Sequence, residues 1–188
     1  MLELLLQRRS TPARLLGPPG PDDAQLHALL DAAVRVPDHG RLRPWRFLRI
    51  HGDARTALGD VLARRRREIE PEAPDSAVEK DRQRFAFAPI IIAVIACPVV
   101  GHKVPESEQL ASGAAVCFAL LQAAHGLGFG GQWLTGWPAY DPVIRRQLGL
   151  AGHERILGFI HIGHSDRPGP ESERPDPAHL LSDWQPTP

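Results

Sequence analysis

The sequence has few cysteines, no excess charge of either sign and no long uninterrupted apolar run. Its two cysteines, Cys97 and Cys117, each lie within an apolar stretch. A disulfide-stapled secreted domain is therefore not expected, and a reducing, cytoplasmic compartment is. The 22 basic and 22 acidic residues give a formal net charge of zero. This balance gives no electrostatic reason to bind nucleic acid or an anionic membrane, and neither is expected as a partner.

Signals for targeting, membrane insertion and metal binding are also lacking. At the start of the chain the charges follow the apolar stretch, whereas a secretory signal places them in front. The longest apolar runs fall short of the roughly 18 residues of a membrane span. The nine histidines show no ligand spacing with a third partner, so no metal site is predicted. No P-loop, G-x-S-x-G or CxxC motif occurs.

The 188 residues suffice for one domain with a substantial core. Apolar spacing predicts helices over 2–8, from Asp22 or Asp23 to 36, from an Asp53 cap onward, and over 76–85, 106–127 and 141–148. Strands are predicted over 45–50, 90–96, 129–135 and 156–162. This mixture predicts one α+β domain over residues 1–164 and an extended, proline-rich tail over 165–188. Helix 106–127 is expected to be buried on all sides, because apolar residues surround most of its axis.

The tripeptide Arg8-Arg9-Ser10 follows the first predicted helix. Guanidinium groups form bidentate, charge-assisted bonds to phosphate, so these residues suit a phosphate clamp. Arginine also suits a solvated helix C-terminus, where it faces the negative end of the helix dipole. The same reading, a solvated helix end, is preferred for the basic run Arg64–Arg67.

A donor-rich loop over residues 37–45 contains His39 and follows Arg35. Loops held between a helix and a strand often carry functional groups, although this one also fits a plain polar connector. His39 suits either a titrating acid or base, or a fixed hydrogen-bond donor.

The segment Gly126–Gly131 matches the pattern G-x-G-x-x-G. In a dinucleotide-binding turn that pattern leaves a strand and opens a helix, whereas here it leaves a helix and enters a strand. The dinucleotide fingerprint is therefore rejected, and Gly126 is predicted to cap the preceding helix. The sequence His161-Ile-Gly-His164 spells a tRNA synthetase signature at the wrong end of a small chain, and we attribute it to chance.

Three segments in order resemble the nitroreductase family, specifically a small bacterial branch. They are Arg8-Arg9-Ser10, the segment from Pro37-Asp38-His39 through Pro44-Trp45-Arg-Phe47, and Gly130-Gly-Gln-Trp133-Leu-Thr135-Gly. The resemblance covers nearly the whole chain. It implies a nitroreductase-like α+β fold, with a central mixed or antiparallel sheet flanked by helices. It also implies an intertwined homodimer with active sites at the interface, in which helix 106–127 packs against its twin.

The resemblance further implies an FMN-dependent oxidoreductase that takes hydride from NAD(P)H and reduces a small oxidised acceptor, nitroaromatic or quinone-type, by a ping-pong mechanism. FMN N5 would carry the chemistry, and no side chain is predicted to be catalytic. A flavin needs a cationic phosphate clamp, a flat apolar slot and donors near its pyrimidine ring. The chain contains residues suited to each of these roles.

Site residues carried over from the resemblance fall into four groups. Arg8, Arg9 and Ser10 would contact the FMN phosphate and ribityl chain. Arg35 and His39 would reach the flavin from the partner subunit. Trp133, Leu134 and Thr135 would pack beside the cofactor. The turn before that strand would face the nicotinamide dinucleotide, through Ala123, Ala124, His125, Gly126, Leu127 and Gly128.

The chain departs from the family pattern at Arg43, where glutamine is usual, and at Leu134, where a close relative has arginine. It also contains only two lysines, Lys80 and Lys103. These changes bear on the acceptor rather than on the phosphate clamp. Two alternatives stay open at this point. One is a flavin-binding or flavin-storing dimer without efficient turnover, and the other is different flavin chemistry on the same fold, such as flavin fragmentation or dehalogenation.

Overall fold

A computed structural model describes residues 2–187. Its centre is a four-stranded sheet with strand order β1-β2-β4-β3, in which all neighbouring strands are antiparallel. The strands are β1 (Trp45–His51), β2 (Ile90–Ala96), β3 (Gly130–Leu134) and β4 (Arg155–Gly163). The central sheet was expected to be mixed or antiparallel, and it is antiparallel. Strands β1 and β3 form its two edges.

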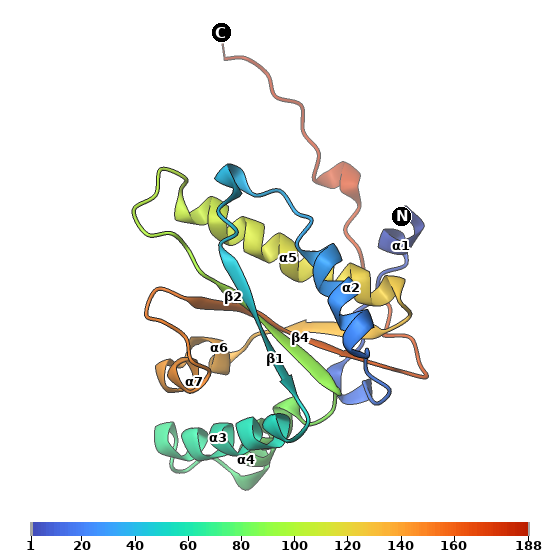
Figure 1. The fold of residues 1–188 in the computed structure, drawn as a ribbon. Coiled ribbons are helices and arrows are strands. Elements are labelled where there is room, and N and C mark those ends of the chain that lie inside the picture. Colours follow the sequence, from blue (N-terminus) through green and yellow to red (C-terminus); the bar gives the residue numbers. More distant parts are fainter. Residues whose placement is uncertain (1, 188) are drawn as a thin grey trace.

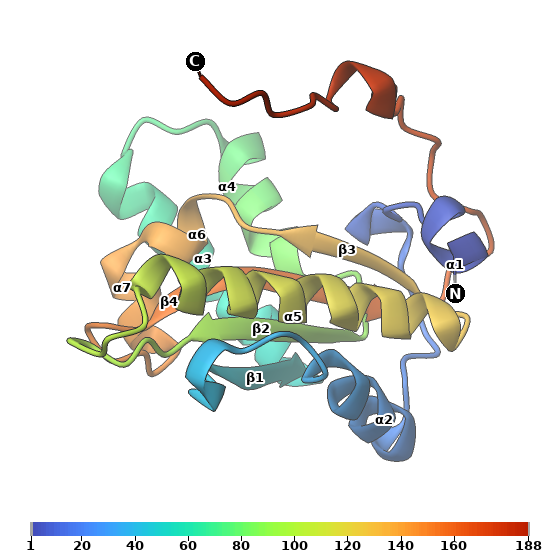
Figure 2. The same ribbon diagram turned by 90° about the horizontal axis from the view of Figure 1, so that it is seen from above.

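Helices cover both faces of the sheet (Figures 1 and 2). On one face lie α2 (Asp23–Ala33) and α5 (Glu106–Gly126). On the other lie α3 (Asp53–Ile69), α4 (Asp75–Arg82), α6 (Trp137–Tyr140) and α7 (Pro142–Gln147). The short α1 (Leu2–Leu6) contacts α5. Short 3-10 turns are η1 (Ala13–Leu15), η2 (His39–Arg41), η3 (Gln83–Phe85) and η4 (Pro177–His179).

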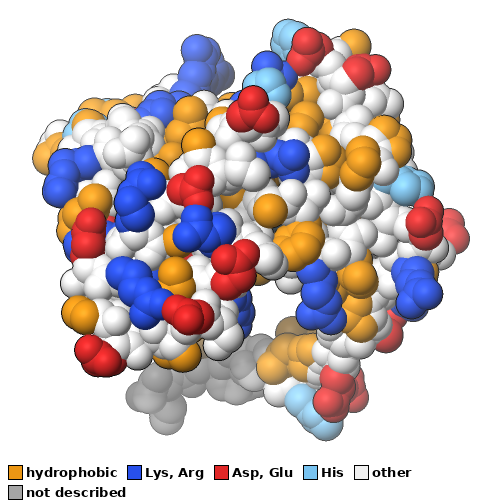
Figure 3. All heavy atoms as spheres, turned by 90° about the horizontal axis from the view of Figure 1, so that it is seen from below, with side chains coloured by type: hydrophobic (Ala, Val, Ile, Leu, Met, Phe, Trp, Pro, Cys, Tyr) orange, Lys and Arg blue, Asp and Glu red, His pale blue; other side chains and the backbone are white. Residues whose placement is uncertain are grey.

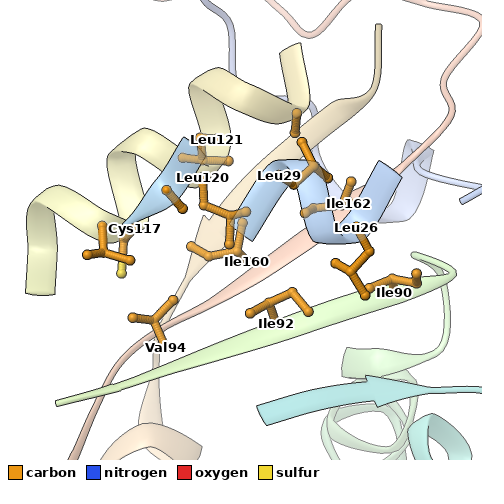
Figure 4. Packing of buried hydrophobic residues seen from close by; sticks show 13 residues of the cluster. Leu26, Leu29, Ile90, Ile92, Val94, Cys117, Leu120, Leu121, Ile160 and Ile162 are labelled. Atoms are coloured by element: carbon orange, nitrogen blue, oxygen red, sulfur yellow. The ribbon is translucent and has the colours of Figure 1, made fainter. Parts of the chain in front are cut away.

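The core has two layers because β2 and β4 are apolar on both sides. Ile92 of β2 and Ile160 of β4 point toward α2 and α5, where they meet Leu29, Leu120 and their neighbours (Figure 4). Alternate residues face the opposite way and pack with side chains of α3 and η3. The prediction of a strand buried on both faces is confirmed, since every residue of β2 is buried.

Helix α5 is not buried on all sides in the single chain, so that prediction is wrong. Phe118 is 45% exposed, Ala111 is exposed, and Ala115 and Gln122 are only partly covered. These positions recur at helical spacing and form one stripe along α5, which we call the α5 stripe. The sheet and α2 cover the other sides of the helix. The single chain therefore leaves part of the apolar surface of α5 uncovered.

Two of the predicted helix caps need correction. Asp22 caps α2 as predicted, with its carboxylate accepting a hydrogen bond from the Gln25 amide at 2.7 Å. Asp53 is instead the first residue of α3, and the N-cap is Gly52. Gly126 is the last residue of α5, and the glycine with positive φ after the helix is Gly128, at φ 82°. Helices commonly end with a residue in the left-handed conformation, and here that residue is Gly128, two positions after the predicted Gly126.

The run Arg64–Arg67 is not simply a solvated helix end. Arg65 pairs with Asp141 at 3.1 Å, and Arg66 pairs with Asp81 at 2.7 Å. Arg67 pairs with Asp75 at the start of α4. The run therefore ties α3 to α4 and to the cap of α7. On this face of the molecule basic and acidic side chains are interspersed (Figure 3).

After His164 the described chain is extended apart from η4. It first passes along the segment that follows α1 and then projects away from the sheet (Figures 1 and 2). Leu180, Leu181 and Trp184 of this tail are exposed. Of the helices within residues 2–187, none is long and apolar enough to cross a membrane.

Candidate functional site

A cavity of about 710 Å³ lies where α5 ends and β3 begins. Its lining includes Arg9, Thr11, His125, Gly130 and Arg167. The segment after α1 reaches it because the Thr11 amide donates a hydrogen bond to the Gly131 carbonyl at 3.0 Å, which holds the segment along β3. Two guanidinium groups from opposite ends of the chain therefore face one cavity. Such an arrangement suits an anion.

Of the predicted clamp residues, Arg9 lines the cavity, whereas Arg8 and Ser10 pair with each other beside it. Arg8 Nη1 donates to Ser10 Oγ at 3.2 Å. Arg9 pairs with Glu171 of the tail at 2.7 Å. Arg167 is a cavity residue that sequence reasoning missed, because it lies in a proline-rich tail and only the fold brings it to Arg9.

The predicted dinucleotide turn divides between cavity and core. His125 and Gly128 line the cavity, while Ala124 is buried in the core and Ala123 packs against it. Gly126 and Leu127 are exposed. Burial lowers the pKa of His125, and the positive charge of Arg8 lowers it further, which favours the neutral imidazole.

The outer edge of β3 offers free backbone groups. Since the Gly131 carbonyl bonds to Thr11, Gly131 directs its backbone away from β4. In an antiparallel ladder every second residue does so, and this places the backbone groups of Trp133 on the same outer edge. Thr135 directly follows the last residue of the strand, Leu134. The Trp133 side chain is engaged elsewhere, because its indole donates to the Leu157 carbonyl at 3.0 Å. The backbone of Trp133 is therefore directed to the outer edge of the sheet, while its side chain is held against β4.

A second hollow of about 600 Å³ lies at the far end of β3. Leu134 and Phe87 supply apolar lining, and Arg14, Lys80 and Arg84 supply positive charge. Among residues 2–187, Arg14 and Lys80 form no ion pair, whereas Arg84 pairs with Asp81 at 2.9 Å. The segment 9–14 separates the two hollows along the same strand edge. The first hollow is lined by Arg9 and Arg167, and the second combines basic side chains with an apolar lining.

Asp81 binds Arg84, one of the residues that line this second hollow. Its side chain is 1% exposed and accepts hydrogen bonds from Arg66, Arg84 and the Trp137 indole. Burial by itself would raise the pKa of this carboxyl, but the bonds from Trp137 and Arg66 outweigh it and lower the pKa. Asp81 thus stays ionised and holds Arg84 in place.

Arg35 and His39 lie at the other end of α5. His39 Nδ1 is 2.6 Å from Glu108 Oε2, and Ser112 Oγ donates to the Pro37 carbonyl at 2.6 Å. These contacts fix the loop beside the first turns of α5, far from α1 (Figure 2). Glu108 and His125 are 17 residues apart, which is about 25 Å along a helix. Within one chain, the structure therefore does not bring Arg35 and His39 to the cavity of Arg9.

Neither His161 nor the cysteines form a reactive centre. His161 is buried, stacks on Phe85 at 5.7 Å and forms no hydrogen bond through either ring nitrogen. Burial, with Arg84 nearby, lowers its pKa to about 4, so it is a neutral core residue at neutral pH. Burial raises the pKa of Cys97 to about 11 and that of Cys117 to about 12, which keeps both as thiols. Within residues 2–187, His, Cys, Asp and Glu form no cluster that could hold a metal.

Comparison with known proteins shows the family to which the chain belongs. The family model described as "Nitroreductase family" matches residues 5–164, so the chain belongs to the nitroreductase family. It is 38% identical over 162 residues to the Escherichia coli (strain K12) protein named "Putative NAD(P)H nitroreductase YdjA", and the match covers 86% of each chain.

Solved structures share the fold at lower identity. A nitroreductase-like family protein from Bacillus cereus superposes with a TM-score of 0.82 at 22% identity, covering 98% of this chain and 95% of the other. A nitroreductase from Bacteroides fragilis with bound FMN superposes with a TM-score of 0.70 at 18% identity, covering 98% of both chains. The nitroreductase-like fold expected from the sequence is confirmed.

Proposed function

We propose that this chain is an FMN-dependent oxidoreductase that uses NAD(P)H to reduce small nitroaromatic or quinone-type acceptors. The carrying observation is the convergence of Arg9 and Arg167 on one cavity beside the open edge of β3. Family membership supports the proposal, as do the name of the E. coli relative and the FMN bound in the B. fragilis protein. We further propose that residues 1–164 form the FMN-binding domain and that 165–188 form an extended tail, which contributes Arg167 to the cavity.

The residues present fit FMN along the β3 edge. Arg9 and Arg167 would hold the phosphate, with Arg8 and Ser10 beside it. The backbone of Trp133, with Thr135 just beyond the strand, would face the ring system, which Leu134 would border in the second hollow. His125 and Gly128, at the cavity wall, are the members of the predicted dinucleotide turn best placed to meet a ligand. When bound, FMN supplies the redox chemistry, accepting hydride from NAD(P)H and delivering it to the acceptor.

Under this proposal the side chains bind and orient and do not react covalently. Lys80 and Arg14, which pair with no carboxylate in the described chain, provide positive charge near the ring. Positive charge there favours the anionic form of a reduced flavin, as an electrostatic effect of fixed cations. The residues tied into ion pairs around Asp81 keep this wall of the hollow rigid.

The proposed assembly is a homodimer in which each site takes residues from both chains. Two α5 helices packed antiparallel along the α5 stripe would bury Phe118 and its neighbours. A twofold axis near the middle of the helix would bring the Arg35 and His39 end of one subunit to the Arg9 end of the other. The α5 stripe and the separation of about 25 Å along the helix both support this arrangement.

The experiment is a visible absorption spectrum of the purified protein, followed by heat release and identification of any flavin. We expect a yellow protein that releases FMN at about one per chain. Steady-state NAD(P)H oxidation with and without a nitroaromatic or quinone then separates an oxidoreductase from a flavin-storing protein. A colourless protein that takes up no added FMN would overturn the proposal.

A further inference from the structure

The C-terminal segment returns to the start of the chain at the proposed phosphate clamp. Glu171 Oε2 lies 2.7 Å from Arg9 Nη2. Arg9 Nη1 also donates to the Gly169 carbonyl at 3.4 Å, and Arg174 Nη2 donates to the Arg8 carbonyl at 3.0 Å. Three contacts therefore join residues 169–174 to the tripeptide that the proposed function assigns to phosphate.

Residues 169–174 can lie close to the backbone of Ser10 because residue 169 is glycine. A Cβ added at this position would lie 2.4 Å from the Ser10 carbonyl oxygen and 2.8 Å from its carbon. Both neighbours are backbone atoms, which cannot move aside as a flexible side chain would. Gly169 is buried, whereas the residues from 170 to 187 are exposed. The contact with the clamp thus depends on a specific residue type.

Glu171 is the one carboxylate among the described residues that line the cavity, and Arg9, Arg167 and His125 line it too. It carries a single charge, and its side chain is 60% exposed. A phosphate monoester carries up to two charges and has three acceptor oxygens, so it makes more charge-assisted bonds to a guanidinium. A phosphate can therefore replace this carboxylate on Arg9, but the two cannot use the same guanidinium edge together.

We propose that Glu171 is an internal competitor for the phosphate site, occupying Arg9 when the cofactor phosphate is absent and leaving it when the phosphate binds. The inference rests on the proposed function, which assigns the phosphate to Arg9. Its consequence is that the tail sets how tightly the cofactor is held. An exposed ion pair of this kind changes an equilibrium by a factor of up to about five.

The test is titration of the flavin-free protein with FMN and, separately, with riboflavin, following flavin fluorescence. Glu171→Gln is expected to lower the Kd for FMN by about two- to five-fold. Its Kd for riboflavin should not change, because riboflavin has no phosphate to compete for Arg9. Glu173→Gln is the matched control, since it removes the same charge from a neighbouring exposed residue of the tail. Its Kd for FMN should equal that of the unaltered protein.

A second variant keeps every charge. Glu171→Asp shortens the side chain that reaches Arg9, and it should lower the Kd for FMN in the same direction. An FMN affinity that is unchanged or weaker in Glu171→Gln overturns the competitor while leaving the proposed function intact. Absence of FMN binding in the unaltered protein and in all variants overturns both.

Discussion

Arg9 is the residue on which the proposed phosphate site depends most. It lines the cavity, and its guanidinium already binds a carboxylate in the structure. Arg9→Ala should weaken FMN binding about ten- to a hundred-fold, since a charge-assisted hydrogen bond contributes roughly 1.5–3 kcal/mol. Fluorescence titration measures the change. Arg64→Ala is the control, because Arg64 is an exposed arginine of α3 that does not line this cavity. Equal Kd values for the two variants would contradict the assignment.

Glu154 shows how one buried carboxylate joins elements, and it gives a prediction about acid. It pairs with Arg46 of β1 at 2.7 Å and accepts from the Ala151 amide at 2.8 Å, in the turn before β4. The hydrogen bond from Arg46 lowers its pKa from 4.5 to about 2. The folded pKa lies below the unfolded one, so this stabilisation is complete above about pH 4.5 and is lost as pH falls toward 2.

Glu154→Gln should therefore lower the free energy of unfolding at neutral pH by about 1.5–3 kcal/mol, the range for a charge-assisted bond. It should also flatten the dependence of stability on pH below about 4.5. Urea unfolding at pH 7, 4 and 3 measures both effects. Glu173→Gln, in the exposed tail, should leave both unchanged. If Glu154→Gln lost as much stability in acid as the unaltered protein, other carboxylates would be responsible for that loss and the prediction would be wrong.

At the scale of elements, local patterns were sufficient for the strands and the longer helices. The alternation of Trp45–Ile50 and the β-branched run of β2 are short-range signals, and both strands lie where predicted. Helix α6 was missed because four residues, Trp137 to Tyr140, are too few to show a helical period. The ion pairs of Arg65 and Arg66 were missed because their partners come from other elements, which spacing along the chain cannot reveal.

The α5 stripe gives a prediction at the same scale. Phe118→Glu should break the proposed dimer, because it would place a charge in the centre of the packed helices. Ile69→Glu is a matched control, since Ile69 is 46% exposed against 45% for Phe118 and lies at the end of α3. Light scattering should give the monomer mass for Phe118→Glu and about twice that mass for the unaltered protein and the control. A dimer that survives Phe118→Glu would place the interface elsewhere.

For the whole molecule, the candidate site was predictable only in pieces. Arg9 could be proposed from its neighbours in sequence, and the resemblance added Arg35, His39 and the β3 segment. Arg167 and Glu171 could not be predicted, since a proline-rich tail has no periodicity and the fold alone brings it to Arg9. The sequence also gives no separation between His39 and Arg9. The structure shows that α5 holds the two residues at its opposite ends. Because one chain keeps them so far apart, we propose that two chains share each site.

This shared site is the central claim, and complementation between defective subunits tests it most directly. Arg9→Ala would be co-expressed with the double variant Arg35→Ala/His39→Ala, and FMN content would be measured at a concentration where neither variant alone retains flavin. If each site draws on two chains, a mixed dimer has one intact site. Random pairing should then restore FMN to about a quarter of all sites. If one chain builds the whole site, no intact site can form, and an FMN content of zero in the mixture would contradict the account.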